Sequence, residues 1–266
     1  MGQAIEIVVG RTTAPGAVIT GLTVNSGNSY TVRYAREGSE ILLLSTWAKN
    51  QAAGIMRVRS PLMHDNVQGI RHRIVLGNVF PRVPYQRLQR LNSQDQLAVE
   101  LSGSAVAGDV EIGGLLLWYE DLIGTEGRFI SSDELDARAE DLVTVEAACV
   151  GIASGDYGAS VGITAAFDTL RANTDYAVVG YQVDALCGAV RLRSADFGNL
   201  GIGGPGLAAE PKLTSSWFVA IASSIKKAAI PVFNSANKGS VLVDVVSDEN
   251  VGTFNVNWLL CQLRPG

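Results

Sequence analysis

Gly54-Ile-Met-Arg57-Val-Arg59-Ser60 returns later in the chain as Gly188-Ala-Val-Arg191-Leu-Arg193-Ser194. Both segments follow the pattern G-x-x-R-x-R-S and carry an apolar residue between the two arginines. Three further matches keep the same order along the chain: Thr23-Val24 with Tyr30-Thr-Val32 against Thr169-Leu170 with Tyr176-Ala-Val178, Leu97–Leu101 against Val241–Val245, and Gly108–Leu117 against Gly252–Cys261 without a gap. Internal similarity of this kind predicts a tandem duplication of one β-rich module of about 115 to 120 residues.

The modules read as strands, because β-branched and aromatic residues alternate between clusters of Gly, Asn, Ser and Pro. In the first copy the pattern predicts strands over 4–9, 17–24, 29–34, 40–46, 54–60, 70–79, 96–102 and 108–119. Many short strands with almost no helix predict an all-β fold, a β-sandwich of jelly-roll or immunoglobulin-like topology in each copy. The strand order is left open by the sequence.

The expected fold is therefore two tandem β-sandwich domains of jelly-roll type, joined by a short linker that contains a helix. The predicted bounds are 1–122 for the first copy, 123–144 for the linker and 145–266 for the second copy. Within the linker, Ser131 and Glu134 have the spacing of a capping box and precede good helix formers. Loops that differ between the copies are expected around 37–53 and 201–216, since insertions concentrate in surface connections.

Composition limits the possible classes of protein. Of the 266 residues, 47% are hydrophobic and 18% charged, which excludes a disordered chain and favours extensive buried or interfacial surface. The net charge of −5 argues against a protein that coats nucleic acid over its whole surface. Cys149, Cys187 and Cys261 have neither zinc-site nor disulfide spacing, so buried thiols are expected. Because signal-peptide and membrane-span patterns are both absent, folding in a reducing cytoplasm is expected.

No catalytic, cofactor-binding or metal-binding residues are predicted. The only histidines are His64 and His72, too few for the metal sites of a tandem β-barrel enzyme, and His64-Asp65 reads as a turn pair. The segment 201–206 satisfies G-x-G-x-x-G, but Pro211 follows at once and no βαβ unit surrounds it, so a flexible loop is expected. The acidic pairs at 120–121 and 248–249 read as solvated strand ends.

A basic stretch stands out in this acidic chain. Seven arginines lie between residues 57 and 90 with Asp65 as the one acid, and two of them recur in the second copy. A salt-bridged sheet face and an intersubunit contact explain them equally well, and contact with nucleic acid or lipid headgroups ranks third because interleaved aromatic residues are missing. The candidate interface or phosphate-contacting residues are Arg57, Arg59, Arg71, Arg73, Arg82, Arg87, Arg90, Arg191 and Arg193.

On the repeats at 54–60 and 188–194, the matching final strands and the short linker, the chain resembles the double jelly-roll major capsid proteins of icosahedral tailless viruses. The resemblance spans nearly the whole chain, but the chain is small for that family and its copies are unusually alike. It implies a structural, non-enzymatic protein of the virion, a homotrimer with pseudo-hexagonal outline that contacts other capsid proteins and takes no cofactor or small-molecule substrate. A minor capsid protein stays open as a variant of this interpretation.

The alternative is a duplicated β-sandwich binding protein, such as a phage receptor-binding or carbohydrate-binding module. Such modules present aromatic platforms, for which Trp47 and Trp217 are the candidates. Trp118 and Trp258 lie in the apolar final strands of the two copies and read as core or interface residues.

Overall fold

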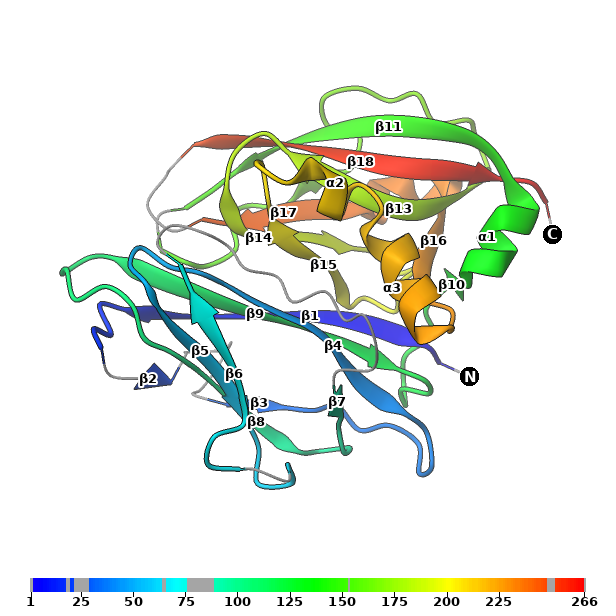
Figure 1. Ribbon diagram of the computed structural model, residues 1–266. Coiled ribbons are helices and arrows are strands. Elements are labelled where there is room, and N and C mark those ends of the chain that lie inside the picture. Colours follow the sequence, from blue (N-terminus) through cyan, green and yellow to red (C-terminus); the bar gives the residue numbers. More distant parts are fainter. Residues whose placement is uncertain are drawn as a thin grey trace.

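Two β-sandwiches follow one another along the chain in the computed structural model (Figure 1). The structure describes residues 2–17, 20–21, 29–63, 66–75, 89–152, 154–247 and 252–265. Each sandwich consists of two sheets, and every pairing between their strands is antiparallel. The predicted all-β fold of two tandem sandwiches is confirmed.

The first sandwich has one long, mostly buried sheet and one more exposed sheet. The buried sheet has the order β1-β9-β4-β7, and the exposed sheet has the order β2-β8-β5-β6, with β3 also paired to β8. The bounds are β1 (Ala4–Thr13), β2 (Thr20–Gly21), β3 (Tyr30–Thr31), β4 (Ile41–Lys49), β5 (Gly54–Arg59), β6 (Ile70–Ile74), β7 (Gln89–Arg90), β8 (Gln96–Leu101) and β9 (Val110–Tyr119).

The second sandwich repeats this arrangement. Its sheets have the orders β10-β16-β13-β18-β11 and β12-β17-β14-β15. The strands are β10 (Phe129–Ile130), β11 (Ala139–Val150), β12 (Val161–Gly162), β13 (Asp175–Val183), β14 (Cys187–Arg193), β15 (Gly201–Gly206), β16 (Ile230–Asn234), β17 (Leu242–Val246) and β18 (Thr253–Leu263). The helices are α1 (Ser132–Arg138), α2 (Pro211–Thr214) and α3 (Trp217–Ile225), with a 3₁₀ turn over Ser235–Ser240.

The strand order decides between the two topologies that the sequence leaves open. In each sandwich the first strand lies beside the last, and the second lies beside the one before the last: β1 with β9 and β2 with β8, then β11 with β18 and β12 with β17. The order of these strands is that of the jelly roll, to which β3 in the first sandwich and β10 in the second are additions. The two copies are therefore of jelly-roll type.

The four sheets lie in succession through the molecule (Figure 1). The sheet with β5, β6 and β8 is followed by that of β1, β4 and β9, then by that of β14, β15 and β17, and last by that of β11, β13 and β18. Sheet β1-β9-β4-β7 is thus covered on both faces, and all nine residues of β4 and all ten of β9 are buried. The outermost sheets each keep one face uncovered by the other described strands.

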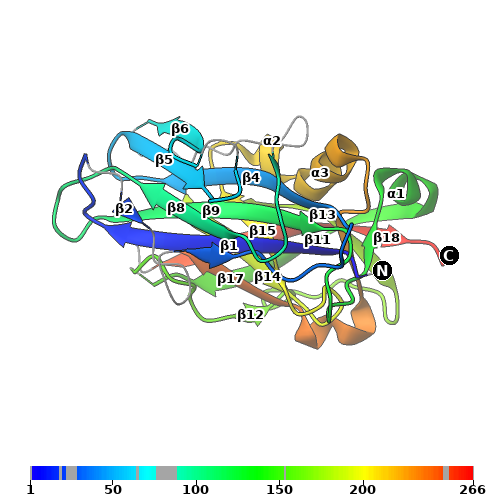
Figure 2. The ribbon, with the colours of Figure 1, turned by 90° about the horizontal axis from the view of Figure 1, so that it is seen from below.

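The link between the copies begins as the capping-box spacing predicts. The Ser131 hydroxyl accepts a hydrogen bond from the Glu134 backbone N–H (3.1 Å), and α1 follows directly. The chain enters β11 at Ala139, directly after the helix. Both chain termini lie at the same end of the molecule as α1 (Figure 2). The bounds 1–122, 123–144 and 145–266 stay a prediction.

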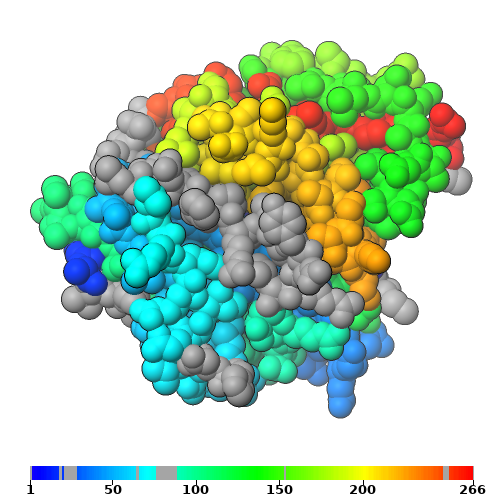
Figure 3. Space-filling view, viewed as in Figure 1, coloured from blue at the N-terminus to red at the C-terminus, as the bar shows by residue number. Residues whose placement is uncertain are grey.

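Three local expectations are wrong. The stretch around 37–53 is not a divergent surface loop, because it contains the buried core strand β4. The glycine-rich segment at 201–206 is the buried strand β15, because its glycines let the backbone approach close neighbours: a Cβ on Gly203 would lie 1.9 Å from the Val190 carbonyl oxygen. The residues after it form α2 and α3, where Trp217 and Phe218 are fully buried. Figure 3 shows this segment, coloured yellow to orange, running across the middle of the face in view, between the green and the cyan parts of the chain. The predicted turn pair His64-Asp65 lies outside the described residues.

Candidate functional site

An ion cluster marks the uncovered face of the first sandwich. Met56 and Val58 on β5 point into the core, so Arg57 and Arg59 point outward. Both arginines bind Glu100 on β8: Arg57 Nε donates to Oε2 (2.5 Å) and Arg59 Nη2 donates to Oε1 (2.9 Å). Burial alone would raise the pKa of Glu100, but the hydrogen bonds from the two arginines outweigh it and hold that pKa below its ordinary value.

The second sandwich repeats this cluster. Arg191 on β14 binds Asp244 on β17 through two parallel hydrogen bonds of 2.7 and 2.9 Å, and Arg193 Nη2 donates to the same carboxylate (3.1 Å). The Arg191 guanidinium also lies 3.4 Å from the centre of the Tyr157 ring. The prediction that the repeated arginines share one sheet face is confirmed, while their role in an interface stays a prediction.

Sequence reasoning missed the acids at the centre of the clusters. Glu100 and Asp244 occupy the same place in the matched segments Leu97–Leu101 and Val241–Val245. The sequence did carry a signal for them, since an acid recurs between apolar residues in both matched segments. In the structure each acid lies on the strand next to the arginines, directly opposite one of them.

The two clusters differ in what covers them. The face with Arg191 lies against the first sandwich: a Cβ on Gly201 would lie 2.5 Å from Arg191 Cδ and 3.3 Å from Ile7 Cγ2. Nearby, Arg11 on β1 forms an ion pair with Asp156 (2.8 Å). The face with Arg57 has no such cover from the other described strands. The cluster of the second sandwich thus borders the contact between the sandwiches, where the Arg193 side chain stays 37% exposed, and that of the first sandwich lies at an end of the molecule.

The uncovered face carries more positive charge on β6. Arg71 and Arg73 are exposed and alternate with His72 and Ile74, and Arg71 lies directly opposite Arg57 in register. We call Arg57, Arg59, Arg71 and Arg73 the basic face. Arg90 lies elsewhere, on β7, where it forms an ion pair with Glu40 (2.9 Å). The candidates Arg82 and Arg87 lie outside the described residues.

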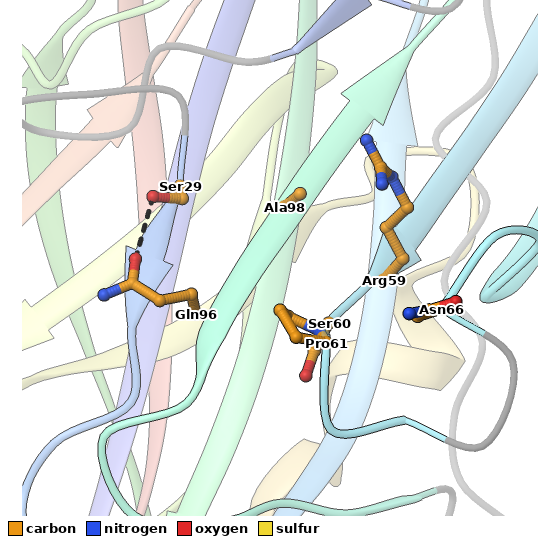
Figure 4. A pocket seen from close by; sticks show the side chains of 7 residues that line it. All are labelled: Ser29, Arg59, Ser60, Pro61, Asn66, Gln96 and Ala98. Carbon is orange, nitrogen blue, oxygen red and sulfur yellow. Dashed lines mark hydrogen bonds between the residues drawn. The ribbon is translucent and has the colours of Figure 1, made fainter.

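An open hollow of about 220 Å³ lies beside Arg59 on this face (Figure 4). Ala98 on β8 lies opposite Arg59, and the Ser29 hydroxyl donates to the Gln96 side chain (3.1 Å) at one side. In the second sandwich Leu242 stands opposite Arg193, at the position of Ala98. The small Ala98 side chain leaves space at the position that leucine takes in the other copy.

The contact between the sandwiches is mostly apolar. Trp47 on β4 donates its indole N–H to the Gly188 carbonyl oxygen (2.8 Å), and Trp118 on β9 donates to the Ala228 carbonyl oxygen (3.0 Å). The buried residues that the first sandwich contributes on this side are Ile5, Ile7, Leu42, Leu44, Trp47, Val110, Ile112, Leu116 and Trp118.

The aromatic platform expected for a binding module is not available on these tryptophans. Trp47 is 1% exposed and Trp217 is fully buried, with its indole N–H donating to the Gly203 carbonyl oxygen (3.0 Å). Trp47 is buried because both faces of its sheet are covered, and Trp217 because α3 packs on the second core. Their candidacy as surface platforms is therefore wrong, whereas the interpretation of Trp118 and Trp258 as core or interface residues is confirmed.

The cysteines and the possible metal ligands form no further site among the described residues. All three cysteines are free and buried, as expected, and burial raises the pKa of Cys149 and that of Cys187 to about 12. Among the described residues, no group of three His, Cys, Asp or Glu side chains is placed to hold a metal ion. In the same part of the chain, no helix is both long and apolar enough to span a membrane.

The comparisons with known proteins give no family. No family model matches the chain, and no curated protein does. Among solved structures, the PBSX exported protein XepA is 10% identical and is covered over 88% of its chain by 94% of this one, with a TM-score of 0.23. The major capsid protein P2 from bacteriophage PM2 is 8% identical over 98% of its chain and 99% of this one, also with a TM-score of 0.23. YhaK from Escherichia coli has the same TM-score at 8% identity, over 86% of its chain and 97% of this one. At TM-scores this low, the similarity is no evidence for fold or function, and the fold of this chain is described from its strand order alone.

Proposed function

We propose that this chain is a structural assembly protein, a double jelly-roll capsid subunit that forms trimers within a virion shell. The observation that carries the proposal is the contact between its two sandwiches. Sheet β1-β9-β4-β7 of the first copy lies on sheet β12-β17-β14-β15 of the second. The two sandwiches thus meet through non-equivalent sheets. The sheet left at the outer end of the first sandwich is the equivalent of the sheet that the second sandwich contributes to the contact, and the converse holds at the other end.

A contact between two different faces can be repeated from one chain to the next. Such heterologous contacts generate a closed ring when the rotation at each step closes, and a filament when it does not. Here the repeating unit is a sandwich, so a ring of three chains contains six similar sandwiches. That arrangement has the pseudo-hexagonal outline of a subunit that tiles a shell.

A non-enzymatic role accords with the chemistry of the repeats. The polar groups shared by the two copies are arginine–carboxylate clusters on sheet faces, where they fix neighbouring strands. A duplicated enzyme or binding module would be expected to repeat a polar pocket. What is duplicated here is the strand framework and its ion clusters.

The oligomeric state tests the proposal. Light scattering and native mass spectrometry of the purified chain at micromolar concentration are expected to give the mass of a trimer. Negative-stain electron microscopy of concentrated samples is expected to show particles with a hexagonal outline. A chain that stays monomeric under all these conditions and forms no lattice would overturn the proposal.

A further inference from the structure

The two outermost sheets have opposite charge. The sheet made by β2, β3, β5, β6 and β8 contains four arginines and one glutamate. The sheet made by β10, β11, β13, β16 and β18 contains four acidic residues and neither lysine nor arginine. Two of the acids, Asp141 and Asp175, form ion pairs with arginines outside the sheet, which leaves Glu140 and Glu146. These sheets lie at opposite ends of the four-sheet stack (Figure 1).

The acidic sheet presents a carboxylate near the middle of its outer face that has no ion-pair partner among the described residues. Val145 and Ala147 are buried in the core, so Glu146 between them points outward. Glu146 lies opposite Asn257, which in turn lies opposite Gln182, so its row across the sheet is otherwise neutral. We call the polar and small outward residues around Glu146, which is the one acid among them, the acidic face: Thr144, Glu146, Ala148, Gln182, Asn255 and Asn257.

The basic face has positive charge that its own sheet does not neutralise. Glu100 binds Arg57 and Arg59, but Arg71 stands directly opposite Arg57, and like charges in directly opposed positions of two strands destabilise a sheet. Arg71 and Arg73 are exposed and contact no acid among the described residues. An acidic surface placed on this face would relieve the repulsion.

The chain itself shows which kind of surface fits there. In the second sandwich, the sheet that carries the equivalent cluster of Arg191, Asp244 and Arg193 lies against β1, β4 and β9 through its strands β14 and β15. The equivalent of sheet β1-β9-β4-β7 in the second copy is β11-β18-β13-β16, whose outer face is the acidic face. The internal contact therefore pairs the same two types of face that remain free at the ends.

We propose that the basic face of one chain docks on the acidic face of a second copy of this chain, with Arg71 and Arg73 placed over the region of Glu146. This inference rests on the proposed assembly function and names the surfaces that make it. Exposed apolar side chains border both faces, Val67 and Val75 beside the arginines, and Leu142 and Val150 on β11. In the proposed interface, these side chains would add buried apolar contact to the pairing of charges. The hollow floored by Ala98 gives space for a side chain of the docked copy.

Charge reversal on each face tests the contact. Glu146→Lys, or Arg71→Glu with Arg73→Glu, is expected to weaken trimer formation roughly tenfold or more, because like charges would then meet across the interface. Combining Glu146→Lys with Arg73→Glu should restore part of the loss. Analytical ultracentrifugation over a series of salt concentrations measures both effects, and the wild-type trimer should dissociate more readily as salt rises.

Lys212→Glu, an exposed charge reversal on α2, is the matched control and should leave assembly unchanged. Circular dichroism and the thermal midpoint establish that each variant is folded. A wild-type trimer that Glu146→Lys leaves intact would overturn this inference while the assembly function stands, whereas a monomeric wild type would overturn the function itself. Arginine variants that lose binding to an oligothymidine strand but assemble normally would assign the basic face to nucleic acid instead.

Discussion

One carboxylate held between two arginines is the side-chain arrangement that both sandwiches share. Arginines two positions apart point to the same side of a strand, and the acid on the neighbouring strand lies within reach of both. In the second copy Asp244 is 1% exposed and accepts hydrogen bonds from Arg191, Arg193 and Ser160. A buried carboxylate needs this number of donors, since it has given up its water.

Removing that carboxylate is expected to be costly. Asp244→Ala leaves two guanidinium groups next to the covered interface without a counter-charge, so the free energy of unfolding should fall by about 3 kcal/mol. Urea unfolding followed by circular dichroism measures the change. Glu100→Ala, the same change in the uncovered cluster, should cost less because Arg59 can turn to solvent. Equal losses of unfolding free energy at the two positions would show that the sheet beside the Asp244 cluster does not add to the cost of removing the carboxylate.

Acid should weaken the Glu100 cluster. The pKa of Glu100 lies below its ordinary value of 4.5 in the folded chain, so the carboxylate favours folding above that value. This contribution is lost as the pH falls from about 4.5 through the lower folded pKa. The difference in unfolding free energy between the wild type and Glu100→Gln should therefore shrink over that range and stay constant from pH 6 to 8. A difference that is unchanged down to pH 3 would refute the assignment.

At the level of strands, the sequence predicted most strand positions well. It did not predict which side of the strand a residue faces where both faces of that strand are buried. β1, β4, β5, β8 and β9 lie within or close to the predicted ranges, although β4 and β9 are buried throughout. The gap-free match of the final strands, however, aligns residues that point to opposite sides. Ile112 on β9 faces the other sandwich, whereas Val256, its partner in the match, points into the second core. A strand covered on both sides has no polar positions to fix its phase.

The segment 201–225 escaped prediction for different reasons. Glycine has no side chain, so β15 shows no alternation of apolar and polar residues. In α3, the run Trp217–Ile225 begins without a side-chain cap and is apolar almost throughout, so neither a capping signal nor a clear helical period marks it. The basic stretch shows the same limit, since sequence spacing identified its arginines but not the acids that bind them.

Strand β15 should tolerate no side chain at Gly203. A Cβ there would lie 1.9 Å from the Val190 carbonyl oxygen on the paired strand, so Gly203→Ala must push β14 and β15 apart. We expect a loss of about 3 kcal/mol, at the upper end for overpacking. Gly239→Ala is the control, because nothing lies within 4 Å of its Cβ position. Thermal unfolding of both variants distinguishes a local steric effect from a general intolerance of glycine substitution.

For the molecule as a whole, the kinds of surface are divided by position. The contact inside the chain is mostly apolar, and the faces at the two ends are polar and carry charges of opposite sign. An apolar contact suits a permanent interface, whereas charged faces keep the free chain soluble and make association depend on salt. In the proposed assembly, the tandem arrangement joins two sandwiches permanently and leaves the contact between chains to the polar faces at the ends.

The apolar contact should also make the two sandwiches unfold together. Ile112 is fully buried, and its side chain reaches the position where Gly188 would carry a Cβ (2.7 Å). Scanning calorimetry of the wild type should thus give one cooperative transition.

Ile112→Asp places a carboxylate in this interface, which costs about 3 kcal/mol or more, and should split the transition into two. Trp47 fluorescence should change in the first transition, because its indole hydrogen bond crosses the interface. Ile112→Val keeps the contact apolar and should retain a single transition. Two transitions in the wild type would mean that the sandwiches are joined by the chain alone, and the internal contact would then be no guide to the contact between chains.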